Sequence, residues 1–224
     1  MNIKHTISNN TFIFENVFDD ISIFDTILSE CKKRELSGDF VARTELFNRT
    51  NSTQFGIQKT YKELSLAEKF IFDNTEFIKN EHLKVDRKDC DINLDESLTS
   101  ILNKRLKDAL KEIYSSDLHD GIWAEYDSVI KYGPGYKMNK HTDAGPIRRT
   151  CTAVLYCNTM LSEYEGGETI FYDDFDNTTE VFRYRPNINE LVLFDSSFNS
   201  DTIHHSVSEI KNWERYVYRV YFNV

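Results

Sequence analysis

The chain has no long apolar run and little cysteine. None of its segments approaches the roughly 20 consecutive apolar residues that a membrane-spanning helix needs, and its first residues lack the apolar region of a secretory signal. We therefore expect no membrane segment and a cytoplasmic location. The four cysteines show no C-x-x-C spacing, so we expect free, mostly buried thiols rather than a disulfide framework or a zinc knuckle. They are Cys31, Cys90, Cys151 and Cys157.

Basic residues are in the minority, with 27 lysines and arginines against 37 aspartates and glutamates, which gives a net charge of −10. The basic residues are scattered, and only Lys32–Arg34 and Arg148–Arg149 form tight groups. Since a nucleic-acid-binding surface is normally a basic stripe, nucleic acid is disfavoured as a partner. The acidic balance leaves room for a basic peptide substrate, although an acidic group such as Asp173–Asp174 usually marks a solvated loop.

Apolar residues recur at intervals of three and four in two segments before residue 120, which predicts amphipathic helices there. One stripe covers residues 18–31 and the other covers residues 98–113, after a capping candidate at Asp95. A third helix is expected around residues 64–78. Residues 48–53 read as a polar loop, with a substrate groove as the less favoured alternative.

After residue 120, short runs rich in valine, isoleucine, tyrosine and phenylalanine alternate with turn residues, which predicts strands. We expect strands near residues 123–132, 150–158, 168–172, 179–184, 190–195, 202–209 and 215–223. Seven or eight such strands are typical of a jelly roll. The predicted fold class is therefore α+β. Residues 1–224 form one domain, in which a mainly helical region (1–120) supports a jelly-roll core (121–224).

The strongest functional signal is His141-Thr142-Asp143, followed by the pair His204-His205. Residues two apart on an extended segment point the same way, so His141 and Asp143 can reach one ion while a third ligand comes from a distant strand. Two imidazoles and a carboxylate can hold one face of an octahedral metal and leave the other positions open, and they suit iron(II), manganese or zinc. An H-x-D sequence alone is common by chance.

Three further segments surround these residues in order: Tyr132-Gly133-Pro134-Gly135, Glu165-Gly166-Gly167-Glu168-Thr169, and His205-Ser206-Val207 leading through Ile210 to Arg215. In this order and spacing, residues 123–224 resemble the prolyl 4-hydroxylase-like branch of the iron(II)/2-oxoglutarate-dependent dioxygenases. The resemblance implies a double-stranded β-helix, which is a jelly roll, with its active site between the two sheets.

The resemblance also implies site residues. The iron ligands would be His141, Asp143 and His205, and the cosubstrate would be bound by Arg215, Tyr132 and Tyr156. Arg215 fits because a guanidinium meets a carboxylate with two parallel hydrogen bonds; the alternative is an ordinary strand arginine. Each tyrosine could instead be a core aromatic.

Four other positions bear on how far the residue roles of the family can be transferred to this sequence. His205 is preferred to His204 because its spacing to Arg215 matches the family, and adjacent strand residues face opposite sides. Arg219 shares the strand face of Arg215, and the roles of His204 and Arg219 are left open. Met138 stands where this branch often has tyrosine, and Trp213 stands where it often has glycine.

The implied activity is hydroxylation of a C–H bond with conversion of 2-oxoglutarate and O2 to succinate and CO2, most often on a prolyl or other peptidyl side chain in this branch. The cofactors would be iron(II), 2-oxoglutarate and O2, with ascorbate left open. The alternatives are hydroxylation of a free amino acid or other small molecule, a non-catalytic metal-binding jelly roll, and a zinc hydrolase. The acceptor and the oligomeric state do not follow from the sequence.

Overall fold

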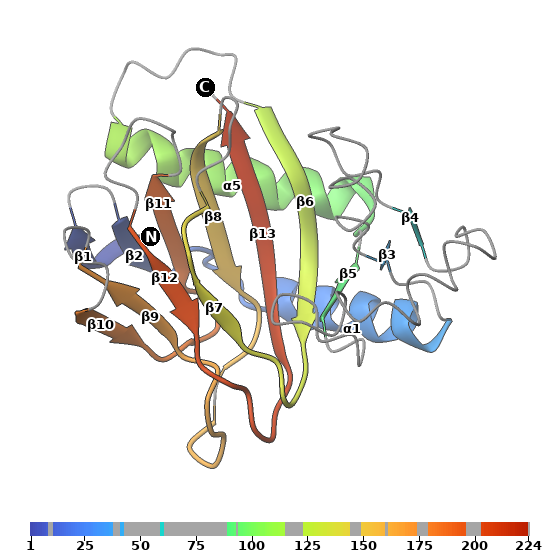
Figure 1. Ribbon diagram of the computed structural model, residues 1–224. Helices are drawn as coiled ribbons and strands as arrows, with labels where there is room; N and C mark the ends of the chain where they lie inside the picture. Colours follow the sequence, from blue (N-terminus) through green and yellow to red (C-terminus); the bar gives the residue numbers. More distant parts are fainter. Residues whose placement is uncertain are drawn as a thin grey trace, which may run out of the picture.

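The structure is a computed structural model (Figure 1), whose described residues form two helices and two antiparallel sheets. It describes residues 1–8, 11–37, 41–42, 59–60, 89–92, 94–114, 123–143, 149–159, 161–173, 179–195 and 203–223. The predicted helix around residues 64–78 and the predicted loop at residues 48–53 lie outside these ranges.

Among the residues that the structure describes, the N-terminal half contributes two helices and five strands. The helices are α1 (Ser22–Leu36) and α5 (Glu96–Tyr114). The strands are β1 (Asn2–Ser8), β2 (Thr11–Glu15), β3 (Val41–Ala42), β4 (Lys59–Thr60) and β5 (Asp89–Ile92).

The C-terminal half contributes eight strands, the number typical of a jelly roll. They are β6 (Trp123–Tyr132), β7 (Met138–His141), β8 (Arg149–Tyr156), β9 (Thr169–Tyr172), β10 (Glu180–Tyr184), β11 (Leu191–Asp195), β12 (His205–Val207) and β13 (Arg215–Asn223).

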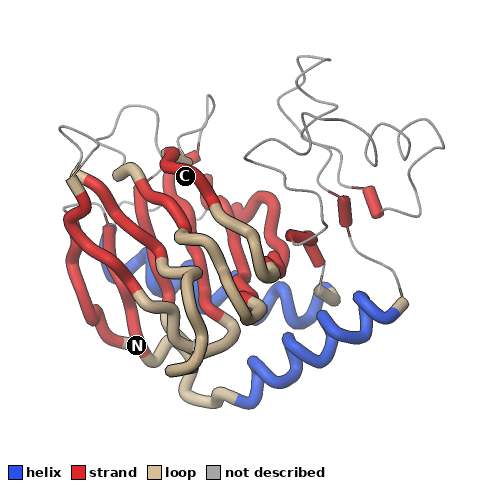
Figure 2. The backbone as a smooth tube through the Cα atoms, turned by 60° about the horizontal axis from the view of Figure 1, so that its bottom comes forward, coloured by secondary structure: helices blue, strands red, loops and turns tan. Residues whose placement is uncertain are grey.

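The strands form a larger and a smaller sheet. The larger sheet has the order β1-β2-β11-β8-β13-β6-β5-β3-β4, and the smaller has the order β10-β9-β12-β7. The helices lie along the larger sheet on the side away from β7, β9 and β12 (Figures 1 and 2). The α+β class and the jelly roll supported by helices are therefore confirmed.

Alternation along β13 shows how the larger sheet serves two cores. Tyr216, Tyr218, Val220 and Phe222 pack against the helices together with Leu102 and other residues of α1 and α5. Between them, Val217 points the other way, into the apolar cluster between the two sheets. Because successive side chains of a strand point to opposite faces, the odd-numbered residues Arg215, Val217 and Arg219 face the space between the sheets.

Helix α5 begins at a capping aspartate, whereas Ile21 at the start of α1 caps the helix with no side-chain hydrogen bond. The backbone N–H of Leu98 donates to Oδ1 of Asp95 over 3.0 Å, as the sequence predicted, and the N–H of Ser22 donates to Asp20 over 2.9 Å. A capping carboxylate satisfies one of the N–H groups that a helix start leaves without a partner. Phe18, which the periodicity placed on the first helix, precedes α1.

The sequence analysis missed the five N-terminal strands that the structure describes and one strand of the C-terminal half. It did not predict the hairpin of β1 and β2, which joins the larger sheet by pairing β2 with β11. It also did not predict β7, whose four residues, Met138 to His141, contain three polar side chains and give little strand signal. The seven predicted C-terminal strands all form, and β7 is the eighth.

The cysteines that the structure describes agree with the expectation from composition. Cys31, Cys151 and Cys157 are free and buried, and burial raises the pKa of the Cys157 thiol to about 12. The side chain of Cys90 lies outside the description. None of the helices that the structure describes combines the length and apolarity needed to cross a membrane.

Candidate functional site

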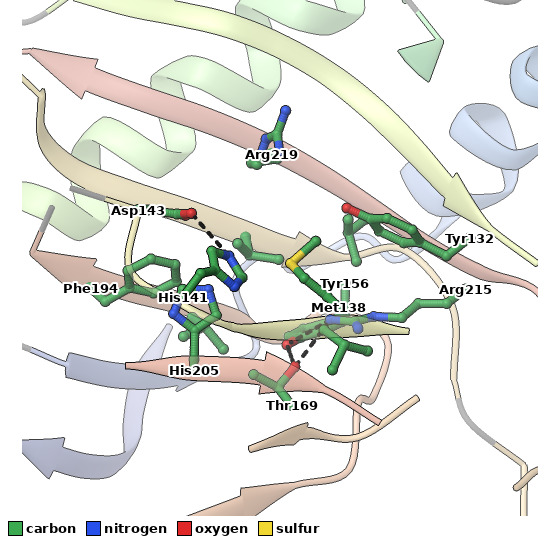
Figure 3. A pocket seen from close by; sticks show the side chains of 14 residues that line it. Tyr132, Met138, His141, Asp143, Tyr156, Thr169, Phe194, His205, Arg215 and Arg219 are labelled. Carbon is green, nitrogen blue, oxygen red and sulfur yellow. Dashed lines mark hydrogen bonds and ion pairs between the residues drawn. The ribbon is translucent and has the colours of Figure 1, made fainter. Parts of the chain in front are cut away.

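A pocket of about 50 Å³ opens between the two sheets (Figure 3). Its polar lining comes from strands far apart in the sequence, and its remaining walls are apolar. The lining residues are Tyr132, Met138, His141, Asp143, Val154, Tyr156, Thr169, Val192, Phe194, His205, Val207, Arg215, Val217 and Arg219. All six side chains that the sequence analysis assigned to iron or to the cosubstrate are among them.

Strand pairing brings the two histidines together across 64 positions of sequence. On adjacent strands of the smaller sheet, His141 of β7 and His205 of β12 are direct partners, and their ring centroids lie 4.3 Å apart. Asp143 follows β7, and its Oδ1 lies 3.4 Å from Nε2 of His141. One ligand atom from each of the three residues lies within 4.8 Å of the others, so the three side chains can reach one ion.

The hydrogen bond on the far side of His141 selects which nitrogen faces the pocket. Nδ1 of His141 lies 2.8 Å from the carbonyl oxygen of Asn139. Because a carbonyl only accepts, Nδ1 is the donor, and in the neutral ring Nε2 keeps its lone pair on the side of Asp143. Metal-binding histidines are typically oriented by such a bond from the second nitrogen.

Charges within this group shift the pKa values in a consistent pattern. Burial alone would lower the pKa of His141, but its hydrogen bond and charge interaction with Asp143 raise it overall. Burial opposes ionisation of Asp143, yet the hydrogen bond from His141 and the surrounding charges hold the pKa of its carboxyl well below the usual range. Burial lowers the pKa of His205 to about 4. At neutral pH, Asp143 is therefore ionised and His205 is neutral, the states that bind metal.

Arg215 occupies the other end of the pocket and is 3% exposed. Its Nη2 donates to the Thr169 hydroxyl over 3.1 Å and lies 3.4 Å from the Tyr156 hydroxyl. Its Nε and Nη1 are buried without a hydrogen-bond partner, although buried polar groups are nearly always paired. A guanidinium with two unused donors in a pocket can bind a carboxylate.

The two tyrosines assigned to the cosubstrate both contact this arginine. The guanidinium lies over the rings of Tyr156, at 5.2 Å, and Tyr132, at 5.7 Å. The Tyr156 hydroxyl shares a 2.9 Å hydrogen bond with Thr169, and burial raises its pKa, so it stays protonated at neutral pH. Figure 3 shows the Tyr132 hydroxyl directed toward the middle of the pocket.

Two lining residues that contact the polar groups of the site were given no role from the sequence. Thr169 holds Arg215 and Tyr156 through its hydroxyl, and its only signal was its place directly after the Gly166-Gly167-Glu168 segment. Phe194 lies 4.7 Å from the His205 ring, centroid to centroid, and was predicted merely as part of a strand. Neither type of residue carries a recognisable spacing of its own.

The structure distinguishes the residues whose roles were left open. His204 is not among the residues that line the pocket, whereas His205 is. Arg219 lines the pocket, and its charge is one of those that lower the pKa of Asp143. Its position is toward the Asp143 end, opposite Arg215 (Figure 3).

A bulge directs Met138 into the same pocket. Residues three apart on a regular strand face opposite sides, yet Met138 and His141 both line the pocket. The pairing of β7 with β12 is irregular here, because His141 pairs with His205 while Met138 pairs with Val207. Three steps along β7 thus match two steps along β12, which is the count of a β-bulge.

The second departure from the family pattern, Trp213, supports the loop before β9. Its Nε1 donates to the carbonyl of Gly166 over 3.0 Å, and its ring stacks on Tyr164 at 5.4 Å. A Cβ on Gly167 would lie 2.6 Å from this ring. The indole therefore fills space between the loop and the turn that precedes Arg215.

The donor set fits the metal and cosubstrate that the sequence pattern implied. Two nitrogen ligands and one oxygen ligand lie within reach of one ion. The buried Arg215, whose Nε and Nη1 have no hydrogen-bond partner, lies in the same pocket. Such a triad leaves coordination positions open, which is the arrangement of non-haem iron(II) oxygenases.

Comparison with protein families gives the same assignment. Residues 128–223 match the 2OG-Fe(II) oxygenase superfamily. The matched region spans β6 to β13 almost completely, and thus both sheets of the pocket. No curated protein matches the sequence.

Solved structures of prolyl hydroxylases share the fold at low sequence identity. A prolyl hydroxylase from Trichoplax adhaerens, in complex with a hypoxia inducible factor peptide fragment, has 19% identity and a TM-score of 0.63, covering 96% of this chain and 84% of its own. A Pseudomonas putida prolyl-4-hydroxylase has 17% identity and a TM-score of 0.60, with 96% and 93% covered. The viral collagen prolyl hydroxylase of Paramecium Bursaria Chlorella virus-1 has 13% identity and a TM-score of 0.56, with 96% of both chains covered.

Proposed function

We propose that this 2OG-Fe(II) oxygenase hydroxylates a C–H bond of a prolyl or other peptidyl side chain, using iron(II), 2-oxoglutarate and O2. One observation carries the proposal: the pocket that contains the His141, Asp143 and His205 ligand atoms also contains Arg215 with two buried N–H groups unused. A metal site alone would explain the triad but not the arginine. A buried cation without a carboxylate implies an anionic ligand.

Each residue has a specific task in this proposal. The three ligands hold the metal on one face, and Asn139 fixes the ring of His141. Arg215 binds the carboxylate of 2-oxoglutarate that lies farther from the metal, with Thr169 and Tyr156 holding the guanidinium in place. The bound metal and cosubstrate supply the oxidation, with release of succinate and CO2.

The apolar lining has a task as well. Val154, Val192, Phe194, Val207 and Val217 surround the polar groups. They exclude water, which strengthens the charge interactions inside the pocket and limits side reactions.

A peptidyl acceptor is supported by the neighbours, since one of the solved structures contains a prolyl hydroxylase with a peptide fragment bound. At 19% identity this neighbour shows the fold alone, and the prolyl residue is proposed because residues 123–224 resemble the prolyl 4-hydroxylase-like branch. A free amino acid or other small molecule is the alternative outcome of the acceptor test below.

The first test separates the oxygenase from other metal-binding jelly rolls. Metal-free protein is mixed anaerobically with iron(II) and 2-oxoglutarate, and the visible charge-transfer band of a chelated 2-oxo acid is recorded. We expect a band in the wild type and in the control His204→Ala, and no band in His205→Ala. Folded wild-type protein that binds iron but gives no band would contradict the proposal.

The second test addresses the acceptor. Proline-rich peptides and free amino acids are incubated with the iron-loaded protein, 2-oxoglutarate and O2, with and without ascorbate, and the products are analysed by mass spectrometry. We expect a peptide to gain the mass of one oxygen atom in step with succinate formation. Coupled turnover of free amino acids alone would move the assignment to the small-molecule alternative.

A further inference from the structure

The pocket contains an oxidisable group that the proposed reaction does not use, the thioether of Met138. The bulge between β7 and β12 directs this side chain into the space that His141 also lines. Figure 3 shows its sulfur pointing into the region between His141, Tyr132 and Arg215. Iron and cosubstrate would both be held next to this region.

The sulfur of Met138 is the most easily oxidised atom among the side chains that line the pocket. A thioether has an accessible lone pair and is converted to a sulfoxide without breaking a C–H bond. The aliphatic neighbours, such as Val154 and Val217, offer only unactivated C–H bonds. The Tyr156 hydroxyl is held by Thr169 and lies near Arg215, so Met138 is the group best placed to intercept the oxidant.

We propose that Met138 is a self-oxidation site: when no acceptor is bound, turnover of 2-oxoglutarate oxidises the Met138 thioether to the sulfoxide and inactivates the enzyme. This inference rests on the proposed function. The reaction balances, because one oxygen atom of O2 enters succinate as 2-oxoglutarate loses CO2, and the other is bonded to sulfur. O2 accepts four electrons, two from 2-oxoglutarate and two from the thioether.

The sulfoxide would close the site by changing the chemistry of its wall. Met138 is half-buried and packs against the apolar cluster between the sheets. A sulfoxide replaces this flexible apolar group with a polar and bulkier one. Next to Tyr132 and Arg215, it would compete for the space and the hydrogen-bond donors that the cosubstrate needs.

The test follows the mass of one peptide rather than activity alone. Iron-loaded full-length protein is incubated with 2-oxoglutarate and 18O2 without an acceptor, digested and analysed by mass spectrometry. The chain has three methionines, so Met1 and Met160 serve as internal controls. We expect one labelled oxygen on Met138, little on the other two, and loss of the charge-transfer band in proportion to the label.

Matched reactions separate this outcome from general oxidation. Met138 should stay unoxidised when 2-oxoglutarate is omitted, and in His205→Ala. Met138→Leu, which nearly conserves volume, should keep the charge-transfer band and lose activity several-fold more slowly than the wild type. Oxidation of Met138 without 2-oxoglutarate, or succinate formation and inactivation with Met138 intact, would overturn the inference. A wild type with neither band nor succinate would instead remove the proposed function itself.

Discussion

One nitrogen of the Arg215 guanidinium makes hydrogen bonds within the protein and the other two make none. The role of these two nitrogens in binding a carboxylate can be tested. Nη2 is bonded to Thr169, whereas Nε and Nη1 are buried without partners. Arg215→Lys keeps the positive charge but offers no planar pair of donors. We expect the Kd of 2-oxoglutarate to rise by about tenfold or more, corresponding to about 1.4 kcal/mol, while iron affinity stays the same.

The measurement is an anaerobic titration of the charge-transfer band with 2-oxoglutarate. Arg183→Lys is the matched control, because Arg183 is exposed and pairs with Glu180 on β10, outside the pocket. Equal cosubstrate affinity in Arg215→Lys and wild type would show that the charge alone suffices and that no bidentate contact is made.

Tyr156 can be tested in the same way. Its hydroxyl is buried, bonded to Thr169 and 3.4 Å from Arg215. Tyr156→Phe removes this hydroxyl but keeps the ring beneath the guanidinium. We expect the Kd of 2-oxoglutarate to rise several-fold, because Thr169 and Arg215 lose a shared partner, with a loss of stability of about 1 kcal/mol. If chemical unfolding shows that loss while Kd is unchanged, Tyr156 is a core aromatic, the alternative that the sequence left open.

At the scale of elements, the loop before β9 depends on two glycines with positive φ. Gly166 has φ +70°, and a Cβ there would lie 1.6 Å from the backbone oxygen of Glu209. Gly167 has φ +84°, but its nearest obstacle is the side chain of Trp213. A side chain can rotate away, whereas the backbone carbonyl of Glu209 cannot move without its neighbours Ser208 and Ile210, whose N–H groups donate to Glu168 and Tyr136.

We therefore expect Gly166→Ala to destabilise the protein by at least about 2 kcal/mol, and by more than Gly167→Ala. The free energy of unfolding is measured by urea titration for both variants. Since the loop is bonded to the residues after β12, as in the bond from Gly167 N–H to the Ser208 carbonyl, Gly166→Ala should also weaken cosubstrate binding. Equal stability of Gly166→Ala and wild type would contradict the close approach.

Elements with a strong period were predictable from the sequence, and irregular ones were not. The apolar stripes of α1 and α5 and the seven strands of the C-terminal half other than β7 were all found. β7 was missed because three of its four residues are polar and its pairing with β12 is bulged, so it shows no apolar alternation. The hairpin of β1 and β2 was missed although Ile3, His5 and Ile7 alternate before Asn9-Asn10 and the apolar run Phe12 to Phe14, which is a hairpin signal.

At the scale of the whole molecule, the candidate site was predictable because its chemistry is encoded in residue types and their order. His141, Asp143, His205 and Arg215 carry distinctive groups at family spacing. Thr169 and Phe194 do not, and only strand pairing brings them to the pocket: Thr169 pairs with Val207 of β12, and Phe194 with Thr152 of β8. Long-range pairing of this kind leaves no local pattern in the sequence. The single-domain organisation stays a prediction.

Metal binding should be visible in the stability of the whole protein. The three ligands come from β7, the residues after it and β12, so an ion that joins them binds the folded chain and not the unfolded one. At iron(II) about 100-fold above its Kd, the free energy of unfolding should increase by about 2.7 kcal/mol. For a chain of this size this raises the Tm by about 5–10 °C, measured by anaerobic thermal unfolding.

The test compares how much iron(II) increases the free energy of unfolding of each variant, and not the absolute stabilities of the variants. Asp143 also interacts with His141 in the metal-free protein, where each stabilises the charged form of the other, so Asp143→Ala changes the baseline as well. The increment on adding iron should vanish in Asp143→Ala and persist in His204→Ala, because only Asp143 lies in the pocket. An equal increment in Asp143→Ala would mean that iron binds elsewhere on this acidic protein, which a net charge of −10 permits for weak surface sites.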